Sequence, residues 1–365
     1  MMMTALSQRK EEWSPNWVTH PGEHLAEHLE AHGWSQAQFA RLAGLSPKLV
    51  STIISGVNPV TAETAIRLER VLGVRADIWT GLQARWDLFH ARAEAKPVLE
   101  MRTWLSLFPV TELRHRKALP ETKDNQALVE ALLRFFAIGT VEAYSSKVKA
   151  LAVHHRRSSA YESSEHHLFS WLMLGEYRAR QMSLPAFNAQ KFEEAVRKIR
   201  SLTAERASVF EPRMKKLCWD AGVALIFEPP ISKTCVFGSA RWFDGEHAII
   251  QMSLRMKTND HFWWTFFHEA AHISLHRGKN FMDDQNGIGD GVEQEADNWA
   301  EEILVGRQRF SHFKQTRPRS RAEVKRFAED IGLHPGIVVG MLQHARVLPF
   351  SNLNDLKTKF EWVRE

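Results

Sequence analysis

The sequence predicts a mostly α protein of the α+β class with one small β-sheet. Apolar residues recur at the helical period of 3.6 over long stretches, for example in NQALVEALLRFF (125–136) and FEEAVRKIRSL (192–202). Two short segments have strand character instead: the apolar run of CWDAGVALIFEPP, which stops at two prolines, and the alternating HAIIQMSLRM. Clusters of Gly, Pro, Asn and Ser punctuate the first 95 residues, as in a small helical bundle.

These changes of pattern divide the 365 residues into four parts. A segment rich in Gly, Asp and Asn, KNFMDDQNGIGDGV (279–292), is expected to be a loop within the last part. We predict an N-terminal tail, a helical bundle of the five-helix type, a helical linker or sensor region, and a domain with the small sheet and C-terminal helices, at residues 1–16, 17–95, 96–210 and 211–365.

The composition is typical of a soluble globular protein, with 44% hydrophobic and 25% charged residues, and we expect the protein to be cytoplasmic. No segment approaches the roughly 18–20 uninterrupted apolar residues that a membrane span needs. The first residues, MMMTALSQRKEEWSP, lack the apolar core of a secretory signal. We therefore expect no membrane association, and we expect the two cysteines, Cys218 and Cys235, to be reduced.

The spacing of SQAQFARLAGLSPKLVSTIISG predicts a helix-turn-helix. Ser35 is placed to cap a first helix whose apolar positions are Phe39, Ala40 and Leu42. Gly44 suits the turn, and Ser46 with Pro47 is a typical start for a second helix. Candidate DNA-contacting residues lie on the outer face and at the helix N-termini: Gln36, Gln38, Ser46, Pro47, Lys48, Ser51 and Thr52.

From Pro21 to about Leu88, including the tail IWTGLQARWDL, the chain resembles the HigA-type antitoxin branch of the Cro/repressor helix-turn-helix family. The resemblance implies binding to double-stranded operator DNA as a homodimer, and in many members neutralisation of a toxin. The charge distribution does not favour this region. Residues 1–95 sum to −1, residues 96–215 to +7 and the rest to −1, so charge alone points to the middle of the chain.

A second functional motif is HEAAH within FWWTFFHEAAHISLH (262–276). On a helix, His268 and His272 project from one face and can share one metal, and Glu269 is placed to act on a water. Zn²⁺ with three protein ligands is the expected cofactor, and Glu269 is the expected general base. His276 lies about 12 Å along the helix from His268, too far for a third ligand, and is expected near the helix end or behind the ligands.

The third ligand is expected in GVEQEADNWAEEILV, where two glutamates compete. Glu293 shares its helical face with small or apolar residues and is the first choice. Glu295, on a more polar face, is the second. Asp297 lies four residues after Glu293 and is predicted to orient one of the histidines.

HEAAH followed by EQEADNWAEEILV resembles the ImmA/IrrE family of metallopeptidases, from about Phe210 to the C-terminus, with Trp299 where phenylalanine is usual. The resemblance implies a gluzincin-like zinc peptidase domain and endopeptidase action on a repressor or regulator. An edge strand of such enzymes often pairs with an extended substrate. We expect this strand to consist of Ile249, Ile250, Gln251, Met252 and Ser253.

An internal repeat links the two ends of the chain. FARLAGLSPKLV (39–50) and FAEDIGLHPGIV (327–338) share the frame F-A-x-x-x-G-L-x-P-x-x-V. The second copy is therefore also predicted to form two helices joined by a tight turn at Gly332. Its second helix lacks basic and hydroxyl groups, which favours a packing or docking role.

Together these patterns predict a DNA-binding transcriptional regulator whose zinc endopeptidase domain cleaves a regulatory protein, a partner or the chain itself. An antitoxin-type repressor that binds DNA and a toxin, with a structural or vestigial metal site, is the main alternative. A metal-sensing repressor without cleavage is another.

Overall fold

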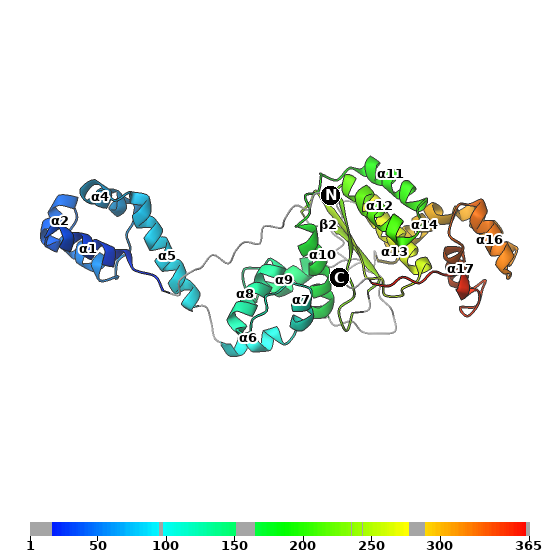
Figure 1. Cartoon of the computed structure of the whole chain (residues 1–365), viewed down its shortest axis with the longest axis horizontal. Helices are drawn as coiled ribbons and strands as arrows, with labels where there is room; N and C mark the ends of the chain where they lie inside the picture. Colours follow the sequence, from blue (N-terminus) through cyan, green and yellow to red (C-terminus); the bar gives the residue numbers. More distant parts are fainter. Residues whose placement is uncertain are drawn as a thin grey trace. The chain divides into compact units, whose positions relative to one another are not determined.

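The computed structural model describes residues 17–94, 98–150, 165–234, 236–242, 244–276 and 289–362. The chain divides into two compact units, Met1–Pro97 and Val98–Glu365. The predicted tail, most of the loop at 279–292 and Cys235 lie outside the described residues. Figure 1 shows the elements of both units, most of them labelled.

The first unit is a bundle of five described helices around an apolar core that includes Leu25, Phe39, Val50, Ile53 and Trp79. The predicted five-helix type of this region is therefore confirmed. Leu42 is the exception to the predicted core positions, because it is 58% exposed. The helices are α1 (Pro21–His32), α2 (Gln36–Ala43), α3 (Pro47–Ile54), α4 (Ala62–Leu72) and α5 (Ala76–Glu94).

Local sequence explains the turn between α2 and α3. Ser35 caps α2 by accepting from the Gln38 backbone N–H, and the Gln38 side chain reaches back to the Ser35 N–H, which forms a capping box. Gly44 ends α2 with φ +64°, a left-handed conformation that glycine adopts without cost. Ser46 then caps α3 through Leu49 N–H, with Pro47 in the first turn.

The second unit surrounds a mixed sheet with helices. Before the sheet come α6 (Val98–Leu105), α7 (Val110–His115), α8 (Asn125–Phe136), α9 (Tyr144–Ala150), α10 (Glu165–Ala179), α11 (Ala189–Arg200) and α12 (Ala207–Asp220). After it come α13 (Asn259–Leu275), α14 (Gly289–Val305), α15 (Arg307–Gln315), α16 (Arg321–Asp330), α17 (Pro335–His344) and the short 3₁₀ helix η1 (Asn354–Leu356). Helices from residues 98–220 share this unit with the sheet.

The sheet has the strand order β1-β3-β2, formed by β1 (Val223–Phe227), β3 (Ala248–Met252) and β2 (Gly238–Trp242). Strand β3 pairs in parallel with β1 and antiparallel with β2. The prediction that Ile249–Ser253 form an edge strand is wrong: Ile249, Ile250, Gln251 and Met252 lie in the central strand. Ser253 follows that strand and donates to the carbonyl of Val236. Full burial of β3 is what its nearly continuous apolar run requires.

Strand β2 was not predicted. Its sequence GSARW contains two polar residues, Ser239 and Arg241, that are nevertheless buried. They lie on the sheet face covered by α10, where Gln251 Nε2 donates to the carbonyl of Trp171 at 2.6 Å and Arg241 to that of Leu172. Buried polar groups require such hydrogen bonds. The polar residues of β2 therefore belong to a buried hydrogen-bond network and do not mark a loop.

Helix α13 covers the other face of the sheet. Its aromatic run packs into the main core of this unit, with Trp263, Phe266 and Phe267 fully buried. A helix that is apolar on nearly all sides is expected in the interior of a domain. Cys218 of α12 lies in the same core as a free, fully buried thiol.

The predicted C-terminal repeat is confirmed as a helix pair. Helices α16 and α17 are joined by a turn in which Gly332 has φ +63°, close to the value at Gly44. Helix α17 begins with His334-Pro335-Gly336, and the imidazole of His334 accepts from Gly336 N–H at 3.0 Å. The same triplet, His20-Pro21-Gly22, begins α1 with the same cap at 2.9 Å. No helix in the described ranges is long and apolar enough for a bilayer.

Candidate metal centre and nucleic-acid interface

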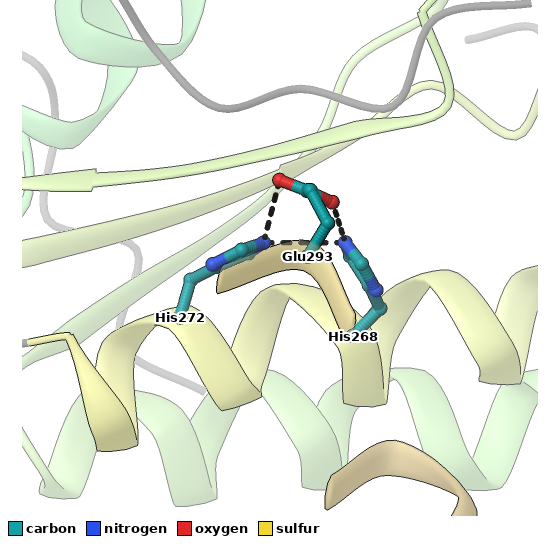
Figure 2. A group of neighbouring side chains, drawn as sticks. All are labelled: His268, His272 and Glu293. Carbon is teal, nitrogen blue, oxygen red and sulfur yellow. Dashed lines mark hydrogen bonds and ion pairs between the residues drawn. The ribbon is translucent and has the colours of Figure 1, made fainter. Parts of the chain in front are cut away.

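Helix α13 places two imidazoles one turn apart on the same face. His268 and His272 are four residues apart, and their side chains are 2% and 5% exposed. Their Nε2 atoms lie 3.2 Å from each other. Figure 2 shows both rings turned toward one point above the helix.

Helix α14 supplies the carboxylate that completes the group. Glu293 Oε2 lies 3.1 Å from His268 Nε2, and Glu293 Oε1 lies 3.6 Å from His272 Nε2. Three ligands at about 2.0–2.1 Å from a tetrahedral zinc would be about 3.3 Å from one another. Each histidine has its nearest Glu293 oxygen at a distance close to this value, and one ligand atom from each of the three residues lies within 4.8 Å of the other two. His268, His272 and Glu293 therefore form a group that can hold a metal.

Asp297 lies one turn after Glu293 and contacts the far side of the first histidine. Its Oδ1 is 2.9 Å from His268 Nδ1. Because the carboxylate accepts, Nδ1 carries the proton and Nε2 is left to face the metal. Burial opposes the charged ring, but the hydrogen bonds to Asp297 and Glu293 outweigh it and raise the pKa of His268 to about 9. A metal ion held by His268 would take the place of that second proton.

The second histidine is oriented by a longer chain of contacts. His272 Nδ1 lies 3.1 Å from His276 Nδ1, and His276 Nε2 lies 3.2 Å from Glu295 Oε2. Glu295 can only accept, so His276 donates from Nε2 and accepts at Nδ1 from His272. The Nε2 atom of His272 is thereby left unprotonated toward Glu293. Glu295, the second choice for a ligand, contacts His276, and His276 lies behind the ligands.

Glu269 lies beside the ligands and is 1% exposed. The start of β2 leaves room for it: a methyl group at Gly238 would lie 2.8 Å from Glu269 Oε1 and 2.6 Å from Thr265 Cγ2. Glycine at the first position of β2 therefore permits the close approach of strand and helix. A carboxylate in this position, next to a bound metal, is suited to proton transfer.

A cavity of about 380 Å³ adjoins the centre. Asp297 belongs both to its wall and to the contact with His268, which connects the cavity to the metal group. Trp264 and Thr265 of α13 and Met341 of α17 line its other sides. The cavity is large enough for one or two side chains of a polypeptide.

In the first unit, the residues predicted to contact DNA lie on α2, on α3 and at the N-cap of α3. Gln36, Gln38, Ser46, Pro47, Lys48 and Ser51 are exposed, and Thr52 is half-buried. Three of these side chains also have structural partners. Ser46 and Gln38 take part in helix caps, and Thr52 donates to the carbonyls of Lys48 and Leu49 at 3.0 Å. Gln36, Lys48 and Ser51 are therefore the members whose polar side chains are exposed without such a structural partner among the described residues.

Comparison with known proteins supports the helix-turn-helix. A family model described as "Helix-turn-helix" matches residues 25–79. The HTH-type transcriptional regulator YddM of Escherichia coli, itself uncharacterized, is 34% identical over 71 residues, which cover 20% of this chain and 76% of that protein. Virulence-associated protein I of Dichelobacter nodosus is 34% identical over 80 residues, covering 22% and 74%.

Solved structures match the same region. The antitoxin GraA is 34% identical, with 21% of this chain and 83% of that one covered and a TM-score of 0.21. An addiction module antidote protein of the HigA family from Coxiella burnetii is 32% identical, with 22% and 96% covered and a TM-score of 0.20. The matching family model does not extend into the second unit, so the resemblance to ImmA/IrrE peptidases gains no support there. Through residues 25–79 the chain belongs to the helix-turn-helix family, and it is a DNA-binding transcriptional regulator.

Proposed function

We propose that the second unit is a zinc-dependent endopeptidase that controls the DNA-binding activity of a regulator in the cytoplasm. The arrangement of His268, His272 and Glu293, with ligand atoms 3.1 to 3.6 Å apart, is the observation that carries the proposal. Three nitrogen and oxygen donors favour zinc and leave a fourth position open. When bound, zinc supplies Lewis acidity that activates water and polarises a peptide carbonyl.

The side chains around the metal have distinct roles in this proposal. Glu269 accepts a proton from the attacking water and returns it to the leaving amide nitrogen. Asp297 holds His268, and Glu295 acts through His276 to hold His272, so that both rings keep Nε2 toward the metal. The substrate is a protein, either a partner repressor or regulator or a copy of this chain.

The strand that would receive an extended substrate is β2 rather than β3. Strand β2 lies at an edge of the sheet in the part of the chain that the structure describes, and its Gly238 is next to Glu269. A substrate strand added to β2 would therefore run past the general base, with its main chain hydrogen-bonded to the sheet. The cavity beside Asp297 would take a substrate side chain.

Metal content measured by inductively coupled plasma mass spectrometry tests the centre. We expect about one zinc per chain in the wild type and in Glu269→Gln, and none in His268→Ala or Glu293→Ala. Glu295→Ala is the matched control on the same helix and should keep its zinc. A wild-type chain that takes up no zinc when the ion is supplied would contradict the proposal.

Turnover then separates an enzyme from a binding protein. With a library of quenched fluorescent peptides and with the chain itself as substrate, Glu269→Gln should lose at least about 100-fold in cleavage rate. Equal behaviour of wild type and Glu269→Gln in every assay would instead favour a repressor with a structural metal site.

That second candidate has its own support in the relatives of the first unit, two of which are an antitoxin and an antidote protein by name. In this alternative the chain binds operator DNA as a homodimer and a toxin as its partner. Co-purification with a toxin, unaffected by Glu269→Gln, would favour it. A metal-sensing repressor is distinguished by operator affinity that changes with zinc and by the absence of cleavage.

A further inference from the structure

A strongly basic surface lies in the second unit. Residues 307–326, RQRFSHFKQTRPRSRAEVKR, contain eight Lys or Arg and one acidic residue, Glu323. Seven of the eight cations are exposed and Lys314 is half-buried. We call residues 307–326 the α15–α16 basic segment. When charge is summed over residues 216–365, the acidic residues of α14 offset the positive charge of this segment.

Most of this charge is not neutralised within the molecule. Glu301 contacts Arg307 at 3.8 Å and Lys314 at 3.5 Å, and Arg321 pairs with Asp355 at 2.5 Å. The other five make no ion pair with any described residue; they are Arg309, Arg317, Arg319, Lys325 and Arg326. The single acid, Glu323, is held in the capping box of α16, with its carboxylate on the N–H and hydroxyl of Ser320. The segment thus keeps an excess of exposed positive charge.

The segment is mounted on a fixed scaffold. The rings of Phe313 and Phe327 stack at 4.0 Å with an interplanar angle of 4°, which joins α15 to α16. Phe310, Val324 and Ala328 are buried in the main core of the unit. The cations therefore project from two packed helices, and little backbone order has to be gained when they bind a partner.

The recognition unit carries no net positive charge. Residues 17–95 sum to a net negative charge, and Lys48 is the one basic residue of α3. Phosphate contacts from Lys and Arg supply a large share of the affinity of DNA-binding proteins. Further phosphate contacts from elsewhere in the chain would therefore strengthen DNA binding by this unit.

We propose that the α15–α16 basic segment is a second DNA-binding surface, which contacts the phosphate backbone without reading the sequence. Six of its eight cations are arginines, whose planar guanidinium groups bind phosphate oxygens in pairs and are weakly hydrated. Duplex DNA is the expected partner because the helix-turn-helix of the first unit already binds it. The proposal is independent of the metal centre.

Salt-dependent DNA binding by the full chain tests this surface. The probe is a fluorescein-labelled 30-base-pair duplex of mixed sequence, and its anisotropy is followed between 50 and 200 mM NaCl. In the patch variant, Arg317, Arg319, Lys325 and Arg326 are changed to Gln. In the control variant the same change is made at four exposed cations of α11 and α12: Arg197, Lys198, Arg213 and Lys216.

Removing four phosphate contacts should lower the slope of log K against log salt by about 3–4. Between 50 and 200 mM NaCl the affinity of the wild type should therefore fall about 100-fold more than that of the patch variant. The control variant should keep the wild-type slope, and circular dichroism should confirm that both variants are folded.

Three results would overturn the proposal. One is a wild type that does not bind the duplex at 50 mM NaCl. Another is an equal loss of slope in both variants, which would reflect net charge alone. The third is an unchanged DNA slope together with patch-dependent binding of poly-glutamate or of phosphatidylserine vesicles, which would assign the surface to an acidic protein or to a membrane.

Discussion

Helices α3 and α17 occupy equivalent places in two copies of one sequence frame, yet their outer faces have opposite surroundings. In α3, Lys48 and Ser51 are exposed. The equivalent residues of α17, Gly336 and Val339, are buried. The difference lies in the neighbours: α17 packs against α13 and η1, and a methyl group at Gly336 would lie 2.7 Å from the carbonyl oxygen of Leu356. The frame therefore specifies two helices and a turn, whereas the outer-face residues decide whether the second helix is available to a partner.

A charge introduced on the outer face should produce the largest difference in stability between a variant of α3 and the equivalent variant of α17. Val339→Asp would bury an unpaired carboxylate and should cost the second unit more than about 4 kcal/mol of unfolding free energy. Its counterpart Ser51→Asp adds the same charge to solvent and should change stability by less than about 0.5 kcal/mol. Urea denaturation followed by circular dichroism compares them. Similar losses in both would mean that α3 is covered as α17 is.

Zinc should stabilise one unit and leave the other unchanged. At a free concentration 100 times its Kd, a ligand that binds only the folded state adds about 2.7 kcal/mol to the unfolding free energy. We expect calorimetry to show this for the second unit, which contains His268 and His272, and no shift for the unit that contains α3. In His268→Ala the effect should vanish. Equal stabilisation of this variant would point to adventitious zinc binding.

The two turn glycines should be equally sensitive, since Gly44 and Gly332 have φ values of +64° and +63°. Alanine in a left-handed conformation costs about 1–2 kcal/mol. Gly81→Ala is the control, because Gly81 lies inside α5 with no other atom near its added methyl group. That change should instead add about 0.5–1 kcal/mol of stability. Unequal costs at Gly44 and Gly332 would show that the two turns differ in strain.

The smallest expected effect concerns DNA. Lys48→Ala removes one cation from α3 and should reduce the salt slope of duplex binding by about 1, with stability unchanged. Lys191→Ala, an exposed cation of α11, serves as the control and should leave the slope as it is. If Lys48→Ala leaves the salt slope unchanged while the patch variant of the α15–α16 basic segment lowers it, Lys48 of α3 does not contact phosphates.

Much of this was predictable because the deciding information is local. The spacing of His268 and His272, the caps at Ser35 and Ser46, and the turn at Gly332 depend on residues within one or two helical turns of each other. The choice of Glu293 over Glu295 required only the helical period, and the structure places Glu293 at the histidines and Glu295 at His276.

The features that escaped prediction depend on contacts between distant residues. The central place of β3 follows from pairing with β1 and β2, which no local pattern specifies. Strand β2 was missed because the polar residues Ser239 and Arg241 suggest an exposed segment. In the structure both are buried beneath α10. The α15–α16 basic segment was missed because charge was summed over thirds of the chain, in which the acids of α14 hide it.

The buried thiol of Cys218 allows the rate at which the second unit opens to be measured. Burial raises the pKa of this thiol far above its usual range, so in the native state it is neither accessible nor ionised. In a Cys235→Ser background, a thiol-reactive dye can label Cys218 only while the surrounding core is open. The labelling rate therefore gives the frequency of that opening without denaturant, and the slowing of this rate by zinc or DNA would reveal which partner closes the unit.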